Sequence, residues 1–479
     1  MKPVRTAHDD GPHPELSSRE RVLVLVPVLP VRGAGAAAAV STGGKLPAKR
    51  SDGENVARPV QAGARARLHS PQDRLDEAMG LAQAIDLTVS AGRIVPVPTP
   101  KPGTLFGTGK VDEIGTWVEG LGVDLVIVDH LVSPVQQRNL EKAWKVKVLD
   151  RTGLILEIFG ARAQTREGRL QVELAHLSYQ KGRLVRAWTH LERQRGGGGF
   201  VGGPGEAQIE LDRRMLQERI DAIRKELDQV VKTRTLHRQG RRKVPYPVVA
   251  IVGYTNAGKS TLFNRLTGAD VLAMDQVFAT LDPTMREVKL ASGRRIILSD
   301  TVGFISDLPT MLIAAFRATL EEVVDADLVL HVRDISHEEA EAQAEDVERV
   351  LESLGIDMTP AENHVLEVWN KIDRLSPVTR SEAENVARFR SPRPVLCSAI
   401  TGEGLASLLD AIDIRLGAAD EIVTVPITPS DGKLRAWLYE NTDVIAAEEM
   451  ADGSAVFTVR VSPDKKGRLT GRLAGGGAQ

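Results

Sequence analysis

The 479-residue chain has little cysteine, few aromatic side chains and no long apolar run. Its one cysteine, Cys397, excludes an internal disulfide framework and a zinc site built from several cysteines, and it suits a reducing compartment. No stretch reaches the roughly 18 apolar residues that a membrane-spanning helix needs. The run "RVLVLVPVLPV" (21–31) is shorter and contains two prolines. We therefore interpret it as a buried strand rather than a signal peptide.

An excess of one charge is also missing, because 62 Lys and Arg stand against 64 Asp and Glu. The whole-chain charge therefore predicts no polyanionic partner. Hydrophobic residues make up 42% of the chain, and its length is enough for several domains, each with a packed core. We expect a cytoplasmic monomer without integral membrane association, and leave a peripheral membrane association open.

Alternating strand and helix patterns predict a multidomain α/β fold class. The expected parts are a mostly flexible N-terminal region at 1–71 with an insertion at 32–71, a small α/β domain at 72–169, an antiparallel helical hairpin at 170–243, a doubly wound α/β sheet at 244–417 and a small α+β domain at 418–479. In the first domain, "GTGK" (107–110) lacks the full spacing of a nucleotide loop, and we interpret it as a turn before a helix.

The hairpin is predicted from apolar residues at a spacing of three or four positions from 170 to 191, with Lys181 filling one step, and from 216 to 230. A glycine-rich tip, "RGGGGFVGGPG" (195–205), separates the two helices. Residues 151–243 hold 20 Lys and Arg against 11 Asp and Glu, a local balance of +9. The arginines that flank the tip are our candidates for RNA contacts, and the alternative is that each is a solvated residue of a coiled coil. These candidates are Arg193, Arg195, Arg213 and Arg214.

The segment "GYTNAGKST" (253–261) follows an apolar strand and precedes a helical pattern, which is the context of a phosphate-binding loop. Backbone N–H groups at a helix N-terminus attract phosphate, Lys259 can reach the β- and γ-phosphates, and the Ser260 hydroxyl can ligate Mg²⁺. The residues expected to bind nucleotide here are Gly253, Tyr254, Thr255, Asn256, Ala257, Gly258, Lys259, Ser260 and Thr261.

Three further motifs occur in the order that a guanine-nucleotide domain requires. "DTVG" (300–303) places Asp300 for a water-mediated contact with Mg²⁺ and Gly303 beside the γ-phosphate. The carboxylate of Asp373 in "NKID" (370–373) can accept two hydrogen bonds from guanine, and adenine lacks that pair of donors. "SAI" (398–400) places main-chain N–H groups near the guanine oxygen. The residues expected to bind GTP in these motifs are Asp300, Thr301, Val302, Gly303, Asn370, Lys371, Ile372, Asp373, Ser398, Ala399 and Ile400.

The segment "FATLDPT" (278–284) is the expected first switch. We expect Thr280 to complete Mg²⁺ coordination when a γ-phosphate is present, and a plain loop threonine is the alternative. Phe278, Ala279, Thr280, Leu281 and Asp282 complete the set expected to bind GTP. The residues expected to act in hydrolysis are Lys259, Thr280 and Gly303. Phe304 stands where many GTPases carry a water-orienting glutamine, so we expect slow hydrolysis by the isolated protein.

The motifs "FGTGKVDEI", "DRTGLILEIF", "LQVELAHLSY", "RLVRAWTHLERQRGGGGFVGGPGE", "GYTNAGKST", "FATLDPT", "DTVGFI" and "NKID" together resemble the HflX family of ribosome-associated GTPases. The resemblance covers about 72–417. It implies that the hairpin enters the large (50S) ribosomal subunit and contacts its rRNA, that the GTP-bound protein splits stalled ribosomes under stress, and that GTP and Mg²⁺ are substrate and cofactor. Two departures are the insertion at 32–71 and Ala207, where a threonine is often found. Some relatives are reported to use ATP in the N-terminal region, so that use stays open.

Other functions stay open at this point. The alternatives are a GTPase that acts in ribosome biogenesis or RNA modification, and a nucleotide-gated binding module whose hydrolysis is incidental. An ATP-driven RNA remodeller is a further idea, against which Asp373 argues because its carboxylate selects guanine.

Overall fold

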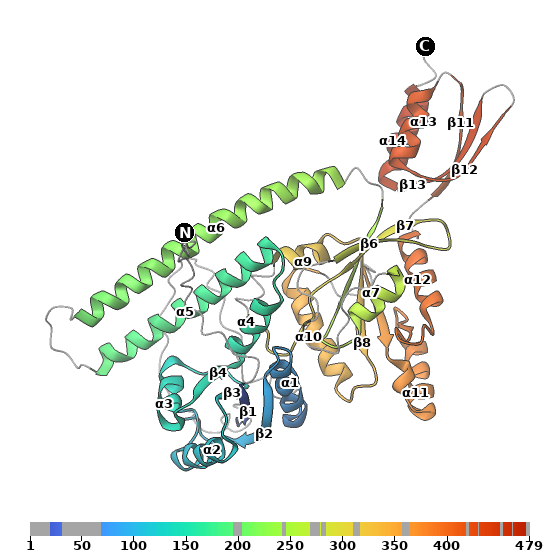
Figure 1. Ribbon diagram of the computed structural model, residues 1–479. Helices are drawn as coiled ribbons and strands as arrows, with labels where there is room; N and C mark the ends of the chain where they lie inside the picture. Colours follow the sequence, from blue (N-terminus) through green and yellow to red (C-terminus); the bar gives the residue numbers. More distant parts are fainter. Residues whose placement is uncertain are drawn as a thin grey trace, which may run out of the picture. The chain divides into compact units, whose positions relative to one another are not determined.

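The computed structural model describes residues 20–30, 69–194, 204–241, 246–268, 278, 284–309, 317–356, 364–417, 421–429, 431–450, 454–461 and 463–475 (Figure 1). The chain divides into two compact units, Met1–Ile158 and Phe159–Gln479, and each is described by itself. Among the described residues, no helix is both long enough and apolar enough to cross a membrane. The predicted insertion at 32–71 falls almost wholly outside the described residues.

The first unit contains a parallel four-stranded sheet in the order β2-β1-β3-β4. Its strands are β1 (Arg21–Val28), β2 (Thr88–Pro96), β3 (Leu125–Val128) and β4 (Lys147–Asp150), and its helices are α1 (Pro71–Gln83), α2 (Thr108–Leu121) and α3 (Pro134–Trp144), followed by α4 (Arg151–Arg162). In the run at 21–31, the buried strand that we expected is β1, which ends at Val28. It holds the second place in the sheet, however, so this domain includes residues well before the boundary at 72. "GTGK" is the cap and first turn of α2, as expected.

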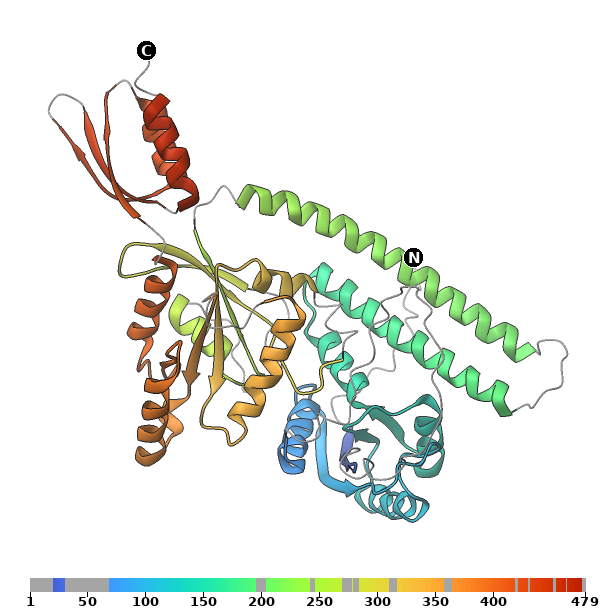
Figure 2. The same ribbon diagram turned by 180° about the vertical axis from the view of Figure 1, so that it is seen from behind.

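The helical hairpin consists of α5 (Arg166–Gln194) and α6 (Pro204–Arg241). Figures 1 and 2 show the two helices side by side, and their seam buries Leu170, Ile220 and Ile223. The Arg219–Glu173 ion pair, at 2.7 Å, joins the helices across the seam. These three residues belong to the predicted apolar repeat, and the side chains of its members from 184 to 191 lie outside the described ones.

The second unit also contains a six-stranded sheet in the order β10-β9-β8-β5-β7-β6, in which only β6 is antiparallel. Its strands are β5 (Val248–Gly253), β6 (Thr284–Lys289), β7 (Arg295–Asp300), β8 (Leu328–Asp334), β9 (Val365–Asn370) and β10 (Val395–Leu396). Its helices are α7 (Lys259–Thr267), α9 (Arg317–Val324), α10 (Ala340–Ser353), α11 (Pro377–Phe389) and α12 (Leu405–Gly417), with the 3-10 helix η2 (Ile372–Arg374). The doubly wound sheet of the predicted fold class is confirmed.

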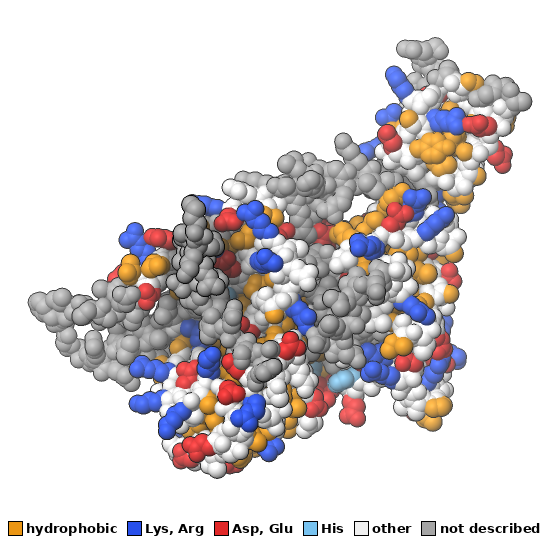
Figure 3. Space-filling view, in the orientation of Figure 1, with side chains coloured by type: hydrophobic (Ala, Val, Ile, Leu, Met, Phe, Trp, Pro, Cys, Tyr) orange, Lys and Arg blue, Asp and Glu red, His pale blue; other side chains and the backbone are white. Residues whose placement is uncertain are grey.

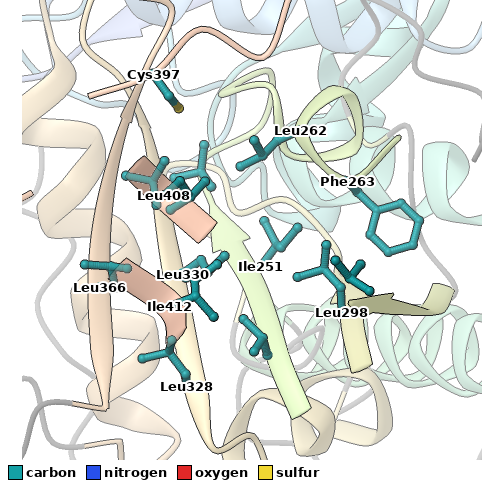
Figure 4. Close-up of a cluster of buried hydrophobic side chains, with 14 of the residues drawn as sticks. Ile251, Leu262, Phe263, Leu298, Leu328, Leu330, Leu366, Cys397, Leu408 and Ile412 are labelled. Carbon is teal, nitrogen blue, oxygen red and sulfur yellow. The ribbon is translucent and has the colours of Figure 1, made fainter. Parts of the chain in front are cut away.

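Strand alternation gives this sheet two different faces. Leu328 and Leu330 of β8 point to the face covered by α7 and α12, where they join the apolar core drawn in Figure 4. His331 and Arg333 alternate with them and are buried as well. Arg333 pairs with Glu341, which lies in α10, at 2.8 Å. The carboxyl ends of β5, β7, β8 and β9 all lie at one edge of the sheet, and the predicted motifs follow those ends.

The C-terminal domain is an antiparallel three-stranded sheet in the order β11-β13-β12. Its elements are β11 (Glu421–Ile427), α13 (Gly432–Asn441), β12 (Asp443–Glu449), β13 (Ala455–Val461) and α14 (Pro463–Gly475). Leu438 of α13 and Leu469 of α14 pack in one core with Phe457 and Val459 of β13. The predicted α+β class is confirmed. The prediction rests on "EIVTVPITP", "GKLRAWLYEN" and "SAVFTVRVSP", and it did not include β12 or α14.

Candidate functional site

The loop between β5 and α7 has the geometry of an anion-binding turn. Asn256 and Gly258 have positive φ values of 59° and 92°, and α7 begins at Lys259 with no side-chain cap on its first N–H groups. A helix N-terminus of this kind favours phosphate. A Cβ at Gly258 would overlap the side-chain amide of Asn370, so glycine lets the loop pass close beneath the carboxyl end of β9.

Lys259 lies in this loop with its charged end buried. Its Nζ donates to the carbonyl oxygen of Tyr254 at 2.8 Å, and the residue is 7% exposed. Burial lowers the pKa of the Lys259 ammonium to about 8; the nearby Asp300 charge opposes this shift and the Lys371 charge adds to it. A buried ammonium without full charge compensation is ready to receive an anion.

Ser260 and Asp300 come together at the start of α7. The Ser260 Oγ donates to the Asp300 Oδ2 at 2.8 Å, and Asp300 is fully buried at the end of β7. Both oxygens are hard donors of the kind that Mg²⁺ prefers, and their meeting at the phosphate loop fits a Mg²⁺ site.

Asn370 is the last residue of β9 and the first of "NKID". Its side chain hydrogen-bonds to the phosphate loop and to "SAI". Its Nδ2 donates to the carbonyl oxygen of Ala257 at 2.8 Å, and its Oδ1 accepts from the N–H of Ala399 at 3.0 Å. One buried amide therefore ties together the segments "GYTNAGKST", "NKID" and "SAI". The sequence predicts that the main-chain N–H groups of "SAI" lie near the guanine oxygen. In the structure the N–H of Ala399 donates to Asn370.

Lys371 is held by a residue that sequence reasoning did not identify. Its Nζ lies 2.7 Å from the Oδ2 of Asp334, and both side chains are largely buried. The Oδ1 of Asp334 accepts from the N–H and Oγ of Ser336 at 3.0 and 2.6 Å. Asp334 ends β8, and β8 is the parallel neighbour of β9. In the sequence Asp334 is only a carboxylate at a strand end, and the pairing of β8 with β9 is what places it against Lys371.

The remaining predicted residues of the base-binding motifs differ in exposure. Ser398 and Ile372 are buried, whereas Asp373 is exposed in the short helix η2. Ile400 is 61% exposed. The exposed Asp373 carboxylate is available to a nucleotide base, and its buried neighbour Ile372 fixes the backbone of η2.

The segment "DTVGF" crosses directly over the phosphate loop. Thr301 donates from its Oγ1 to the carbonyl oxygen of Ile251 at 2.6 Å, and Val302 is buried. A Cβ at Gly303 would lie 2.9 Å from the Nζ of Lys259, so Gly303 lies beside that ammonium. Phe304 is 2% exposed, and its side chain is part of the interior.

Several predicted residues fall outside the described part of the chain. Phe278 is buried, but Ala279, Thr280, Leu281 and Asp282 lie outside it, as does Arg195. Arg193 lies in α5, and its side chain is not among those described. Arg213 and Arg214 are exposed on α6, and Arg214 pairs with Glu218 at 2.9 Å. Basic and acidic side chains are interspersed over the face shown in Figure 3.

Four family models match successive parts of the chain. They are described as "GTP-binding GTPase N-terminal" over residues 72–160, "GTP-binding GTPase Middle Region" over 162–241, "50S ribosome-binding GTPase" over 248–371 and "HflX C-terminal domain" over 387–479. The matched ranges cover most of the chain.

Individual relatives are similar over nearly the same extent. A protein of Magnetococcus marinus named "GTPase HflX" is 50% identical over 402 residues, which are 84% of this chain and 91% of that protein. A protein of Escherichia coli with the same name is 46% identical over 365 residues, which are 76% and 83% of the two chains. The crystal structure of SsGBP in complex with GDP matches with a TM-score of 0.45 and 22% identity over 82% of this chain and 97% of that one.

Proposed function

The chain belongs to the HflX family of GTPases, and on that premise we propose that bound GTP controls its association with the large ribosomal subunit, where it splits or rescues stalled ribosomes under stress. The observation that carries the nucleotide part is the Asn370 side chain, which ties the phosphate loop to both base-binding motifs. The ribosomal part is supported by the description of the matching model and by the net-positive hairpin.

The proposed roles follow the geometry of the site. The N–H groups of the loop at 253–261 and the ammonium of Lys259 bind the phosphates, because both converge at the start of α7. Asp373 accepts the guanine edge, with Lys371 held beside the base by Asp334. The Gly303 N–H meets the γ-phosphate next to Lys259.

Ser260 and Asp300 would hold Mg²⁺, the first directly and the second through water, and Thr280 would complete the shell. When bound, the ion neutralises charge that develops on the phosphates during hydrolysis. Hydrolysis transfers the γ-phosphoryl group of GTP to water, with GDP as the leaving group and phosphate as the other product. The described residues of the loop and of "DTVGF" position the phosphates for that transfer, but Phe304 can neither orient water nor accept its proton.

The lowered pKa of Lys259 makes nucleotide binding dependent on pH. The anionic phosphates favour the ammonium and raise its pKa, so binding takes up a proton wherever the free lysine is deprotonated. The affinity is therefore full below pH 8 and is lost as the pH rises through 8. We expect GDP to bind about tenfold more weakly at a pH of about 9 than at about 7, measured by displacement of a fluorescent nucleotide.

The matched control for this prediction is Lys259→Met, which lacks the titrating group. Its affinity is lower at every pH but should be flat across the same interval. A slope near pH 8 that survives in Lys259→Met would come from another group, and would show that Lys259 binds the phosphates in one charge state throughout.

The ribosomal proposal is tested by sedimentation of intact ribosomes through a gradient. With a non-hydrolysable GTP analogue, the protein should move ribosomes into free subunits and travel with the large one, whereas with GDP it should do neither. The charge-reducing variant Arg213→Gln with Arg214→Gln should weaken binding to the large subunit, and the control Arg388→Gln, exposed on α11, should not. Binding to free large subunits without splitting would favour the role in ribosome assembly instead.

A further inference from the structure

Tyr254 is a residue of the phosphate loop that makes one hydrogen bond within the loop and one to the segment just beyond "DTVGF". Its carbonyl oxygen accepts from the Nζ of Lys259 at 2.8 Å. Its phenolic oxygen accepts from the backbone N–H of Ser306, also at 2.8 Å. Tyr254 is 7% exposed and Ser306 is 6% exposed, so both ends of the second bond lie away from solvent. The side chain of a loop residue therefore holds the backbone just beyond "DTVGF".

The segment between these two bonds is paired with the loop along its backbone. The Phe304 N–H donates to the carbonyl oxygen of Gly253 at 3.1 Å, and the Thr255 N–H donates to that of Phe304 at 2.7 Å. Tyr254 and Phe304 form an isolated parallel bridge. The three bonds fix the backbone from residue 304 to residue 306 against the loop.

Gly303 is the residue whose position depends on this pairing. A Cβ there would lie 2.9 Å from the Nζ of Lys259, 2.9 Å from the Cγ2 of Thr255 and 3.2 Å from its Cα. Such crowding leaves space for glycine alone, and it brings the Gly303 backbone next to the ammonium that a γ-phosphate would meet. A shift of residues 304–306 away from the loop would carry Gly303 with it.

We propose that the Tyr254 hydroxyl is a positioning group for GTP: by holding Ser306, it keeps Gly303 beside Lys259 and so sets the preference for triphosphate over diphosphate. The inference rests on the GTP site proposed above. Only a triphosphate has a γ-phosphate for the Gly303 N–H to meet. A shift of Gly303 away from Lys259 therefore weakens GTP binding and leaves GDP binding unchanged.

The test compares Tyr254→Phe with the parent protein. Phenylalanine keeps the ring and removes the hydroxyl that accepts from the Ser306 N–H. Affinities for GDP and for a non-hydrolysable GTP analogue are measured by displacement of a fluorescent nucleotide at a fixed Mg²⁺ concentration. Loss of one neutral hydrogen bond predicts that the analogue binds about fivefold more weakly, while the affinity for GDP changes by less than about twofold.

Tyr246→Phe is the matched control, because it makes the same chemical change in a residue that precedes β5 and lies outside the site. It should leave both affinities unchanged. Hydrogen exchange gives a second measurement: the amides of 304–306 should exchange faster in Tyr254→Phe and at the parent rate in Tyr246→Phe.

Two outcomes would overturn the inference. An unchanged ratio of the two affinities, which includes an equal loss of both, would mean that the hydroxyl serves only the stability of the loop. A stronger preference for the analogue would mean that the held segment excludes the γ-phosphate. Failure of the parent protein to bind either nucleotide would instead contradict the GTP site itself, so the two failures can be told apart.

Discussion

Replacing Asp373 with asparagine is expected to weaken GTP binding by about a hundredfold or more and to create binding of xanthosine triphosphate. The Asp373 carboxylate is exposed at the edge of the site and is proposed to accept two hydrogen bonds from guanine. An asparagine side chain offers one acceptor and one donor, so one guanine donor would face another donor. Xanthine has an oxygen in place of the 2-amino group, and the new amide donor can meet it.

The measurement is the affinity of Asp373→Asn for GDP and for xanthosine diphosphate, with Asp410→Asn as the matched control. Asp410 is an exposed carboxylate on α12, in the same domain and outside the site, so the control should bind GDP like the parent. Loss of GDP binding without any gain for the xanthine nucleotide would show that the substitution damages η2 rather than base selection. Unchanged GDP binding would remove Asp373 from the site.

The second prediction with a large expected effect concerns the rate of GTP hydrolysis, and it follows from the presence of phenylalanine at position 304. Its side chain is 2% exposed and its backbone is paired with the phosphate loop, so no group at this position can orient the attacking water. The other parts of the phosphate site are hydrogen-bonded within the chain itself: Lys259 to the carbonyl oxygen of Tyr254, and Ser260 to Asp300. We therefore expect the isolated protein to bind GTP tightly, to hydrolyse it slowly, and to be accelerated by at least about a hundredfold when a partner completes the site.

Much of this architecture could be predicted from the sequence because strand and helix patterns repeat with clear periods. The apolar runs that became β5, β7, β8 and β9 are short, β-branched and bounded by turn residues, so both their type and their order were recognisable. The motifs at their carboxyl ends then had to share one edge of a parallel sheet. In the structure the Asn370 side chain hydrogen-bonds to the phosphate loop and to "SAI", so these segments meet at the end of β9.

The features that were missed depend on contacts between segments that are distant in the chain. Asp334 reads in the sequence as an ordinary strand end, and only the pairing of β8 with β9 places it against Lys371. Tyr254 was expected to bind nucleotide as part of the loop. The bond from its hydroxyl to Ser306, 52 residues later, has no signal in local pattern.

The small C-terminal domain shows a different reason why some elements could not be predicted from the sequence. β12 was missed because Ala446 and Ala447 have weak strand propensity, and a register shift between Val444 and Ala446 breaks the alternation. The helix α14 contains three glycines and a lysine-rich start, which weaken its helical pattern. In both elements, packing against neighbouring elements decides the structure where local preference does not.

The measurement that tests the proposal most directly is the rate of GTP hydrolysis by the purified protein, alone and with purified large ribosomal subunits. We predict slow turnover alone and a strong acceleration by the large subunit, with no comparable effect of the small one. An unchanged rate with large subunits, while GTP still binds tightly, would contradict activation by the ribosome.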